Sequence, residues 1–346
     1  MLVGTSSSWL ILNQLGFASL TATKAARCFS VASGRRLVEF GLRRRQGADA
    51  TLIAARSSYL AGFSGTSNLL AGKRYGMPVF GTMSHSFIMA HDSERRAFED
   101  FARTFPKLNT LLVDTYDTAQ GVRNVAELAT RLANEDIKIQ AVRLDSGDLY
   151  QLSRQARAIL DQHGLTDIAI FASGNLDEYR IADLIRAGAP IDAFGLGTAL
   201  TVSDDAPSAD YTYKLADYLG RPRLKTSVGK ATVPGRKQVF RGIDASGHFS
   251  QDLVGLMDES PGSVTREFKP PVSKITPMLQ TVFENGRRAI PAPTLDQSRD
   301  HFMTEFAMLG AKQRSLTNPA AYPVRLTAAL NAMTISEKLR AEQLQD

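Results

Sequence analysis

The chain has 346 residues, of which 43% are hydrophobic and 22% are charged, the composition of an ordinary globular protein. This length can bury one large core or two smaller ones, and it excludes a small disulfide-stapled scaffold and a largely disordered chain. The single cysteine, Cys28, cannot form an internal disulfide, and one thiol cannot make a structural zinc site, which requires about four nitrogen or sulfur ligands. We therefore expect a protein of the reducing cytoplasm.

The chain carries a basic excess, since Lys and Arg (41) outnumber Asp and Glu (35) to give a net charge of +6 and a pI near 9.4. Such a charge suits anionic ligands, for example nucleotides and phosphates. The longest basic cluster is only Arg43-Arg44-Arg45, so nucleic acid is not an expected partner. No apolar stretch approaches the ~20 residues that cross a bilayer, and we expect no membrane partner.

The first segment, residues 1–12, is apolar and superficially resembles a secretory signal peptide. It lacks the basic residues that open such a peptide, and the Ala/Thr/Lys-rich sequence after it continues the same helical pattern. We therefore predict one long helix that belongs to the mature fold.

From about residue 36 to residue 200, short apolar runs alternate with amphipathic segments, a pattern that predicts parallel βα units. In the last predicted helix, Asn175 and Glu178 have the spacing of a capping box, and Gly188 can end the helix in the left-handed conformation. The predicted strands are 37–40, 79–80, 110–113, 140–143, 168–171 and 193–194, and the predicted helices lie near 50–60, 93–104, 117–134, 148–162 and 176–187.

Polar, small and ionisable residues follow each predicted strand. In an α/β barrel these strand ends form one rim, which carries the active site. An open doubly wound sheet would also bind ligands at its strand ends, but six similar units without a topological break favour the barrel. The residues in question are Arg43 and Arg44; Thr82, Ser84 and His85; Asp114; Asp145, Ser146 and Gly147; Ser173, Gly174 and Asn175; and Gly195, Gly197 and Thr198.

The sequence pattern changes after residue 205, where short β-like runs between Gly and Pro turns replace the βα alternation. A proline-containing linker or exposed loop is predicted over 257–275, and a terminal helix over 324–345. We predict three parts: an α/β barrel core over 1–205, a β-rich segment over 206–275 that completes the barrel and a second domain, and a C-terminal segment over 276–346.

His85 lies among hydroxyl residues, in the segment Gly81-Thr82-Met83-Ser84-His85-Ser86. A lone histidine is more often a structural residue that is hydrogen-bonded in a loop. The position of His85 just after a strand favours chemistry, because an imidazole can act as a base or as a nucleophile toward phosphorus.

Arg143 and Asp145 close another predicted strand, in the segment Arg143-Leu144-Asp145-Ser146-Gly147-Asp148. Asp148 fits a structural role at the start of the next helix. Arg143 can bind a carboxylate or phosphate through two parallel hydrogen bonds, whereas Asp145 can accept ribose hydroxyls or hold Mg²⁺ through water. Because side chains alternate along a strand, one of the two must lie in the turn.

Two glycine-containing segments, Ser173-Gly174-Asn175 and Gly195-Leu196-Gly197-Thr198, are typical of loops that hold phosphate groups. Each is a weak signal alone, since such sequences are common in ordinary turns. The sequence contains no Walker A, nucleophile-elbow or Rossmann glycine motif, which disfavours kinase, hydrolase and dehydrogenase functions.

Taken in order, these segments resemble the nicotinate phosphoribosyltransferase family. The resemblance covers about residues 10–255 and extends more loosely to the end of the chain. It implies an irregular α/β barrel of the TIM type with a smaller β-rich second domain. The matching segments are 39–44 (EFGLRR), 65–68 (GTSN), 81–87 (GTMSHSF), 113–117 (VDTYD), 143–148 (RLDSGD), 173–177 (SGNLD), 194–198 (FGLGT) and 229–239 (GKATVPGRKQV).

The resemblance implies an enzyme that converts nicotinate and 5-phosphoribosyl 1-diphosphate into nicotinate mononucleotide and pyrophosphate, the first step of NAD synthesis from nicotinate. ATP hydrolysis drives the reaction, and Mg²⁺ is the implied cofactor. By this resemblance, His85 is phosphorylated from ATP, and Thr82, Arg143 and Phe40 contact nicotinate, although Phe40 could equally be a core residue. The residues implied to bind phosphoribosyl diphosphate are Arg43, Asp145, Ser173, Gly174, Gly195, Gly197 and Thr198.

The resemblance also implies a homodimer and a further N-terminal segment before the point that matches residue 1. In the family that segment forms much of the second domain and supplies a tyrosine to the pyridine site, so we expect an incomplete second domain here. A misassigned gene start and a natural short form would each account for the difference.

Three other functions stay open at this point. A nicotinamide phosphoribosyltransferase would share the fold, but amide recognition uses an aspartate where this chain has Ser67, and an acid would repel a carboxylate substrate. A non-catalytic relic that binds phosphoribosyl diphosphate is disfavoured by the presence of His85, Arg143 and Thr198. An unrelated barrel that binds sugar phosphates would show no dependence on nicotinate.

Overall fold

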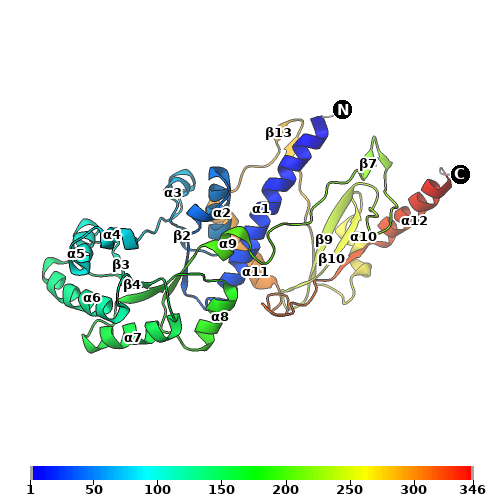
Figure 1. The fold of residues 1–346 in the computed structure, drawn as a ribbon. Coiled ribbons are helices and arrows are strands. Elements are labelled where there is room, and N and C mark those ends of the chain that lie inside the picture. Colours follow the sequence, from blue (N-terminus) through cyan, green and yellow to red (C-terminus); the bar gives the residue numbers. More distant parts are fainter. Residues whose placement is uncertain (1–2, 344–346) are drawn as a thin grey trace. The chain divides into compact units, whose positions relative to one another are not determined.

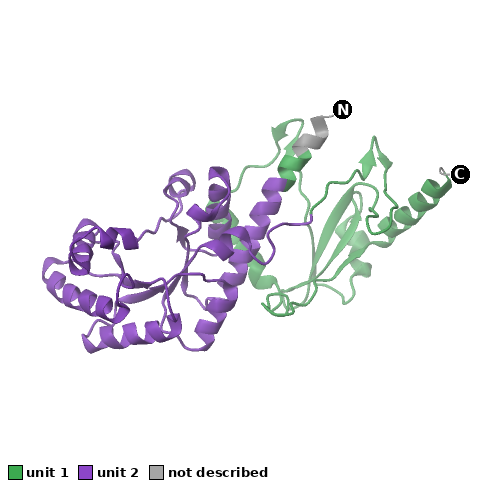
Figure 2. Cartoon of the chain, in the orientation of Figure 1, with its two compact units in different colours: residues 1–12, 211–346 green, residues 13–210 purple. Residues whose placement is uncertain are grey.

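The computed structural model describes residues 3–343, which fall into two compact units (Figures 1 and 2). One unit comprises residues 13–210, and the other comprises residues 211–346 with residues 1–12, as far as these are described. Residues 1, 2 and 344–346, at the outer ends of the two predicted terminal helices, lie outside the described part. Among the helices of residues 3–343, none has the length and apolar character needed to span a bilayer.

The first helix, α1 (Val3–Val31), continues from the apolar start into the Ala/Thr/Lys-rich sequence, as predicted. Ala25, Cys28 and Ala32 are buried on one side of its second half and of the turn that follows. Burial in this apolar setting raises the pKa of the Cys28 thiol well above its usual value. The single cysteine is therefore a packing residue rather than a reactive one.

The unit of residues 13–210 is built on a six-stranded sheet in the order β2-β1-β6-β5-β4-β3, and all neighbouring strands pair in parallel. In a closed barrel of six consecutive strands, β1 would pair with both β2 and β6, and β2 would pair with β3. Here all of these neighbours pair except β2 and β3, so the barrel is open between those two strands. The fold is thus a partial α/β barrel, which confirms the predicted class over the doubly wound sheet. The strands are β1 (Arg36–Glu39), β2 (Gly65–Thr66), β3 (Thr110–Leu112), β4 (Ala141–Leu144), β5 (Ala169–Ala172) and β6 (Ala193–Leu196).

Two details of the predicted strands are wrong. The predicted strand at 79–80 is only an isolated bridge between Val79 and Thr66. The partner of that bridge belongs to β2, which the sequence does not predict because two residues are too short to show a periodic pattern.

The predicted helices of this unit are confirmed to within two residues at each end. Short helices at α3, α4 and α9 are not predicted, since one or two turns carry little periodicity. The helices are α2 (Ala48–Leu60), α3 (Leu69–Tyr75), α4 (His85–Met89), α5 (Glu94–Thr104), α6 (Thr118–Leu132), α7 (Leu149–Gln162), α8 (Glu178–Arg186) and α9 (Thr198–Val202), with 3-10 turns η1 (Leu42–Arg44) and η2 (Ala133–Glu135).

The predicted N-terminal cap of α8 is wrong. Asp177 occupies the cap position, and its carboxylate accepts a hydrogen bond of 2.7 Å from the backbone N–H of Arg180. Asn175 instead turns the chain with φ near +47°. The predicted end of the helix is confirmed, because Gly188 has φ near +74° in the left-handed region.

The unit that contains residues 211–346 is the predicted smaller, β-rich domain. Its four-stranded sheet has the order β11-β9-β10-β14 and packs around a buried cluster of Phe240, Leu253, Val264 and Phe268. Its elements are β7 (Asp217–Tyr218), β8 (Arg221–Pro222), β9 (Lys237–Ile243), β10 (Phe249–Leu256), α10 (Pro261–Val264), η3 (Thr265–Glu267), β11 (Lys274–Pro277), β12 (Phe283–Glu284), β13 (Arg287–Arg288), α11 (Leu295–Met308), β14 (Val324–Leu326) and α12 (Ala328–Gln343).

Two predictions for this unit need correction. The segment 257–275 is not simply a linker or exposed loop, because α10 and η3 lie within it and Val264 and Phe268 are buried. The predicted helix at 324–345 begins later, at Ala328, since residues 324–326 form β14 beside β10. The helical turns α10 and η3 and the strand β14 are each only three or four residues long, which is too short to show a periodic pattern.

Buried charges attach α1 to the barrel. The Lys24 ammonium lies 2.9 Å from Glu178 and 2.6 Å from Asp205, and Arg27 lies 2.7 Å from the same Glu178 carboxylate. The side chains of Lys24 and Glu178 are 4% and 0% exposed. Burial alone would lower the pKa of Lys24, but the hydrogen bonds to Asp205 and Glu178 raise it above its usual value.

We predict that Lys24→Met lowers the free energy of unfolding by about 2 kcal/mol, because the buried Glu178 then loses its buried counter-charge and keeps only the half-buried Arg27. The matched control is Arg186→Ala, which breaks an ion pair with Asp183 whose side chains are 75% and 69% exposed. That change should cost about 0.5 kcal/mol or less. Urea denaturation followed by circular dichroism compares the two, and equal losses would contradict the prediction.

Candidate active site

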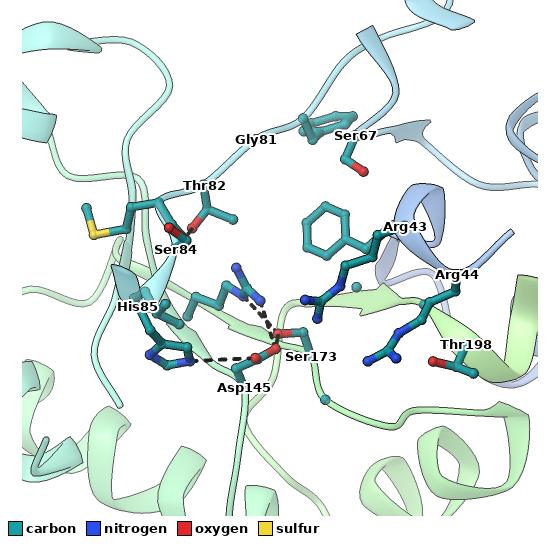
Figure 3. A pocket seen from close by; sticks show the side chains of 18 of the residues that line it. Arg43, Arg44, Ser67, Gly81, Thr82, Ser84, His85, Asp145, Ser173 and Thr198 are labelled. Carbon is teal, nitrogen blue, oxygen red and sulfur yellow. Dashed lines mark hydrogen bonds and ion pairs between the residues drawn. The ribbon is translucent and has the colours of Figure 1, made fainter. Parts of the chain in front are cut away.

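A cavity of about 700 Å³ lies at the carboxyl ends of the parallel strands in the unit of residues 13–210 (Figure 3). Parallel strands present these ends at one edge, so loops far apart in sequence meet there. All the residues that the sequence predicts for the site line this cavity. They are Phe40, Arg43, Thr82, His85, Arg143, Asp145, Ser173, Gly174, Gly195, Gly197 and Thr198.

Arg143 and Asp145 form an ion pair in the cavity wall, with 2.8 Å between Nη2 and Oδ1. Arg143 is in β4 and Asp145 is in the turn after it, which confirms that one of the two leaves the strand. Arg143 Nε also donates to Ser173 Oγ at 2.9 Å, and Ser173 donates to Asp145. Burial opposes ionisation of Asp145, but the Arg143 charge and the Ser173 hydroxyl outweigh it and hold the pKa of Asp145 below its usual value.

His85 is the first residue of α4, which Ser84 caps through a hydrogen bond to the backbone N–H of Phe87. Its Nδ1 is 3.1 Å from the Thr115 hydroxyl. Its Nε2 lies 3.9 Å from Asp114 Oδ1 and 3.8 Å from Asp145 Oδ2. With the side chain 41% exposed, the imidazole is held through one nitrogen and turns the other toward the carboxylates of Asp114 and Asp145, and Figure 3 shows the contact with Asp145.

Asp114 is a functional candidate that the sequence analysis notes at a strand end but does not assign to the site. Its Oδ2 accepts hydrogen bonds from the backbone N–H of Asp145 at 2.9 Å and from Ser146 Oγ at 2.6 Å. Its Oδ1 is buried and has no hydrogen-bond partner within the described part of the chain. A buried carboxylate oxygen without a donor is costly, so this atom is suited to a cation or to a protonated imidazole.

The carboxylates beside His85 fit the needs of Mg²⁺. In residues 3–343 no cluster of three or more His, Cys, Asp or Glu side chains could hold a metal ion by itself. Mg²⁺ is commonly bound through one or two carboxylates together with water and substrate phosphates. Asp114 Oδ1 and Asp145 Oδ2, which both face His85 Nε2, supply that number of protein oxygen atoms.

Phe40 is both a core residue and part of the cavity wall. Its ring lies 5.5 Å from the ring of Phe171 and packs on the buried cluster that contains Val38 and Ala193. The Arg143 guanidinium lies 5.5 Å from the centre of the same ring. A flat aromatic face next to a fixed guanidinium suits a planar ligand that carries a carboxylate.

The opposite wall carries positive charge. Arg43 and Arg44 belong to the exposed turn η1, and Figure 3 shows both side chains on the side of the cavity away from His85, with Thr198 beside Arg44. Arg44 and Ser67 also line the cavity, although neither is among the predicted site residues. The sequence signal that could have assigned Arg44 to the site is its position after a strand, directly following Arg43.

Comparison with known proteins identifies the family. The profile of the nicotinate phosphoribosyltransferase (NAPRTase) family matches residues 35–220, and the profile of the nicotinate phosphoribosyltransferase C-terminal domain matches residues 236–334. The chain belongs to the nicotinate phosphoribosyltransferase family. The family resemblance predicted from the ordered motifs is thereby confirmed, whereas the roles of the individual site residues stay predictions.

Individual relatives agree with this assignment. The nicotinate phosphoribosyltransferase pncB2 of Mycobacterium tuberculosis is 50% identical over 320 residues, which cover 92% of this chain and 66% of that protein. The nicotinate phosphoribosyltransferase of Bacillus subtilis is 35% identical over 336 residues, covering 92% of this chain and 68% of that protein. The chain therefore spans about two thirds of the length of these relatives.

A solved structure supports the fold. The crystal structure of human nicotinic acid phosphoribosyltransferase superimposes with a TM-score of 0.79 at 30% sequence identity, covering 93% of this chain and 74% of that one. The fold of this chain, with its partial barrel and its smaller β-rich domain, is therefore similar to that of the human enzyme.

The glycine between Ser173 and Asn175 permits the closest backbone approach in the cavity wall. Gly174 has φ near +93°, and a Cβ there would lie 2.0 Å from the Asp145 carbonyl oxygen. We predict that Gly174→Ala lowers the free energy of unfolding by about 3 kcal/mol, since it combines a disfavoured φ with a clash against backbone.

Gly188→Ala is the matched control, because Gly188 also has positive φ but a Cβ there would meet nothing within 4 Å. It should cost only about 1 kcal/mol. Thermal unfolding of both variants separates the clash from the backbone strain. Equal destabilisation would show that the contact with Asp145 relaxes without cost.

Proposed function

We propose that this chain transfers the phosphoribosyl group of 5-phosphoribosyl 1-diphosphate to nicotinate and couples the transfer to ATP hydrolysis. The products are nicotinate mononucleotide, pyrophosphate, ADP and phosphate. One observation carries the proposal: a single cavity combines a fixed guanidinium on an aromatic ring, an arginine pair near glycine loops, and a histidine that faces Asp145 in the cavity wall and the buried Asp114. The names of the relatives from M. tuberculosis and B. subtilis support it.

Nicotinate binds between Phe40 and Arg143 in this proposal. Arg143 uses Nε and Nη2 for Ser173 and Asp145, and Nη1 makes no hydrogen bond to the described residues. That nitrogen is available to the nicotinate carboxylate, while the ring of Phe40 supports the pyridine ring. Thr82 offers a hydroxyl from another side of the cavity.

Phosphoribosyl diphosphate lies across the strand ends in this proposal. Arg43 supplies positive charge for the diphosphate, and the backbone at Ser173-Gly174, Gly195 and Gly197 allows close approach of phosphate oxygens. Thr198 contributes a hydroxyl. Cleavage at C1 of the ribose builds positive charge on the sugar, so catalysis consists of positioning nicotinate against C1 and stabilising the departing pyrophosphate.

His85 is the proposed acceptor of the γ-phosphoryl group of ATP. Nε2 attacks phosphorus, the bond to the bridging oxygen breaks, and ADP leaves; water later cleaves the P–N bond and releases phosphate. Asp114 and Asp145 are the residues that would hold Mg²⁺, which would neutralise phosphate charge during both transfers. With its pKa held low by Arg143, Asp145 stays an anion at neutral pH and can serve as such a ligand.

We also propose that the active form is a homodimer in the cytoplasm. The support for the dimer is the family resemblance alone, and the support for the compartment is the lone buried thiol, which fits a reducing environment.

The first test is product formation from nicotinate, phosphoribosyl diphosphate, Mg²⁺ and ATP, measured by chromatography of nicotinate mononucleotide. We predict that His85→Ala lowers the rate by about 100-fold or more, because the phosphoryl acceptor is lost. The control is His301→Ala, an exposed histidine in α11 of the other unit, which should leave the rate unchanged. A folded wild-type chain without product would refute the proposal, and faster turnover of nicotinamide would favour the amide-specific enzyme.

The second test concerns substrate choice at Ser67, which lines the cavity. We predict that Ser67→Asp raises the KM for nicotinate about tenfold more than Ser67→Asn does, since the two side chains have similar size and only the first repels a carboxylate. Competition between nicotinate and nicotinamide measures the effect. Equal KM values for the two variants would place the substrate carboxylate away from Ser67.

A further inference from the structure

Glu39 is a buried carboxylate next in sequence to Phe40, which lines the cavity. It is the last residue of β1, its side chain is 2% exposed, and it is not among the residues that line the cavity. Burying a carboxylate costs free energy, and a well-packed apolar residue is often at least as stabilising in such a place. Stability alone therefore gives a weak reason for a glutamate here.

Both carboxylate oxygens of Glu39 are used, and each holds a different loop. Oε1 accepts a hydrogen bond of 2.6 Å from the backbone N–H of Gly41, in the loop after β1. Oε2 accepts one of 2.6 Å from the hydroxyl of Thr66, the last residue of β2. The backbone carbonyl of Glu39 accepts a further bond of 2.9 Å from the N–H of Ser67.

The Thr66 hydroxyl links Glu39 to the start of helix α3. Its oxygen accepts a hydrogen bond of 3.0 Å from the backbone N–H of Asn68, and the Asn68 side chain caps α3. Glu39 and Thr66 thus define where the β2 loop leaves the sheet. Burial raises the pKa of the Glu39 carboxyl, whereas the Thr66 hydroxyl, the Gly41 amide and the nearby charge of Arg45 favour its ionised form.

The residues held by Glu39 flank the residues that face the cavity. Phe40 lies between Glu39 and Gly41, and Ser67 lies between Thr66 and Asn68. The carbonyl of Gly41 in turn accepts a hydrogen bond from the N–H of Arg44, which shapes the turn η1. One buried side chain therefore connects the two loops that carry Phe40 and Ser67.

We infer that Glu39 is a positioning residue for the nicotinate subsite, acting through the Gly41 amide and the Thr66 hydroxyl to hold Phe40 and Ser67 at the separation that the pyridine ring requires. The inference rests on the proposed function, and it concerns nicotinate binding rather than the phosphorylation of His85. Glu39 itself does not touch the substrate.

The decisive variant is Thr66→Val, which keeps the branched shape and removes the hydroxyl between Glu39 and Asn68. We expect the KM for nicotinate to rise about tenfold, kcat to change by less than about threefold, and phosphorylation of His85 by ATP to continue at the wild-type rate. Thr66→Ser restores the hydroxyl and should return the KM to within about twofold of wild type.

Glu39→Gln is a second variant, which keeps an acceptor for Gly41 but presents an amide N–H₂ to Thr66, so the Thr66 O–H loses the oxygen to which it donates. Its KM for nicotinate should rise at least about threefold. Thermal unfolding and mass spectrometry of His85 phosphorylation are measured on all variants. These two readouts separate a local change at the nicotinate subsite from general loss of structure.

Several outcomes would overturn the inference. An unchanged KM for nicotinate in Thr66→Val would do so. A rise in KM accompanied by comparable falls in kcat, in His85 phosphorylation and in melting temperature would also do so, because it would indicate a purely structural role. Nicotinate dissociation constants from calorimetric titration keep the two proposals apart. If the wild-type chain binds nicotinate but forms no product, only the proposed function is refuted. The dissociation constants of the wild type and the Thr66→Val variant for nicotinate then test this inference. If the wild-type chain does not bind nicotinate, both proposals are refuted.

Discussion

The parallel pairing of six strands is the constraint on which the rest of the site depends. It places the carboxyl ends of β1, β2, β4, β5 and β6 at one edge, so residues as distant as Phe40 and Thr198 line the same cavity. The helices between the strands bury their apolar faces and leave the strand ends to polar loops. Chemistry is therefore confined to the loops, while the strands hold them at set distances.

Charge in and directly around the cavity is divided into two regions. Asp114 and Asp145 surround His85, and the Arg143–Asp145 pair joins this acidic region to the aromatic ring of Phe40. The arginines of η1 make the far side basic. The arginine side is suited to anionic groups, and the carboxylates beside His85 are suited to cationic ones, because each meets opposite charge. Glu39 does not line the cavity and connects the loops that carry Phe40 and Ser67.

Sequence reasoning succeeded where a local signal exists. The long amphipathic helices were predicted within two residues, since their apolar faces repeat over several turns. It failed at α8, where Asp177 rather than Asn175 caps the helix, at Val79, which makes one bridge instead of a strand, and at 257–275, where α10 and η3 form. Each failure concerns one to a few residues, a length at which periodicity carries no information and tertiary contacts decide.

The sequence by itself determined the alternation of strands and helices, because this follows from residue types at fixed spacing. It also carried the family motifs, and the resemblance based on them named eleven of the residues that line the cavity. Only the tertiary structure decided which groups meet: the unpartnered oxygen of Asp114 against His85, the hydrogen bonds that fix Arg143, and the two loops joined by Glu39. Such contacts link residues about 30 positions apart, as in Glu39 to Thr66 with a separation of 27. Their geometry depends on strand order and register, which local sequence does not encode.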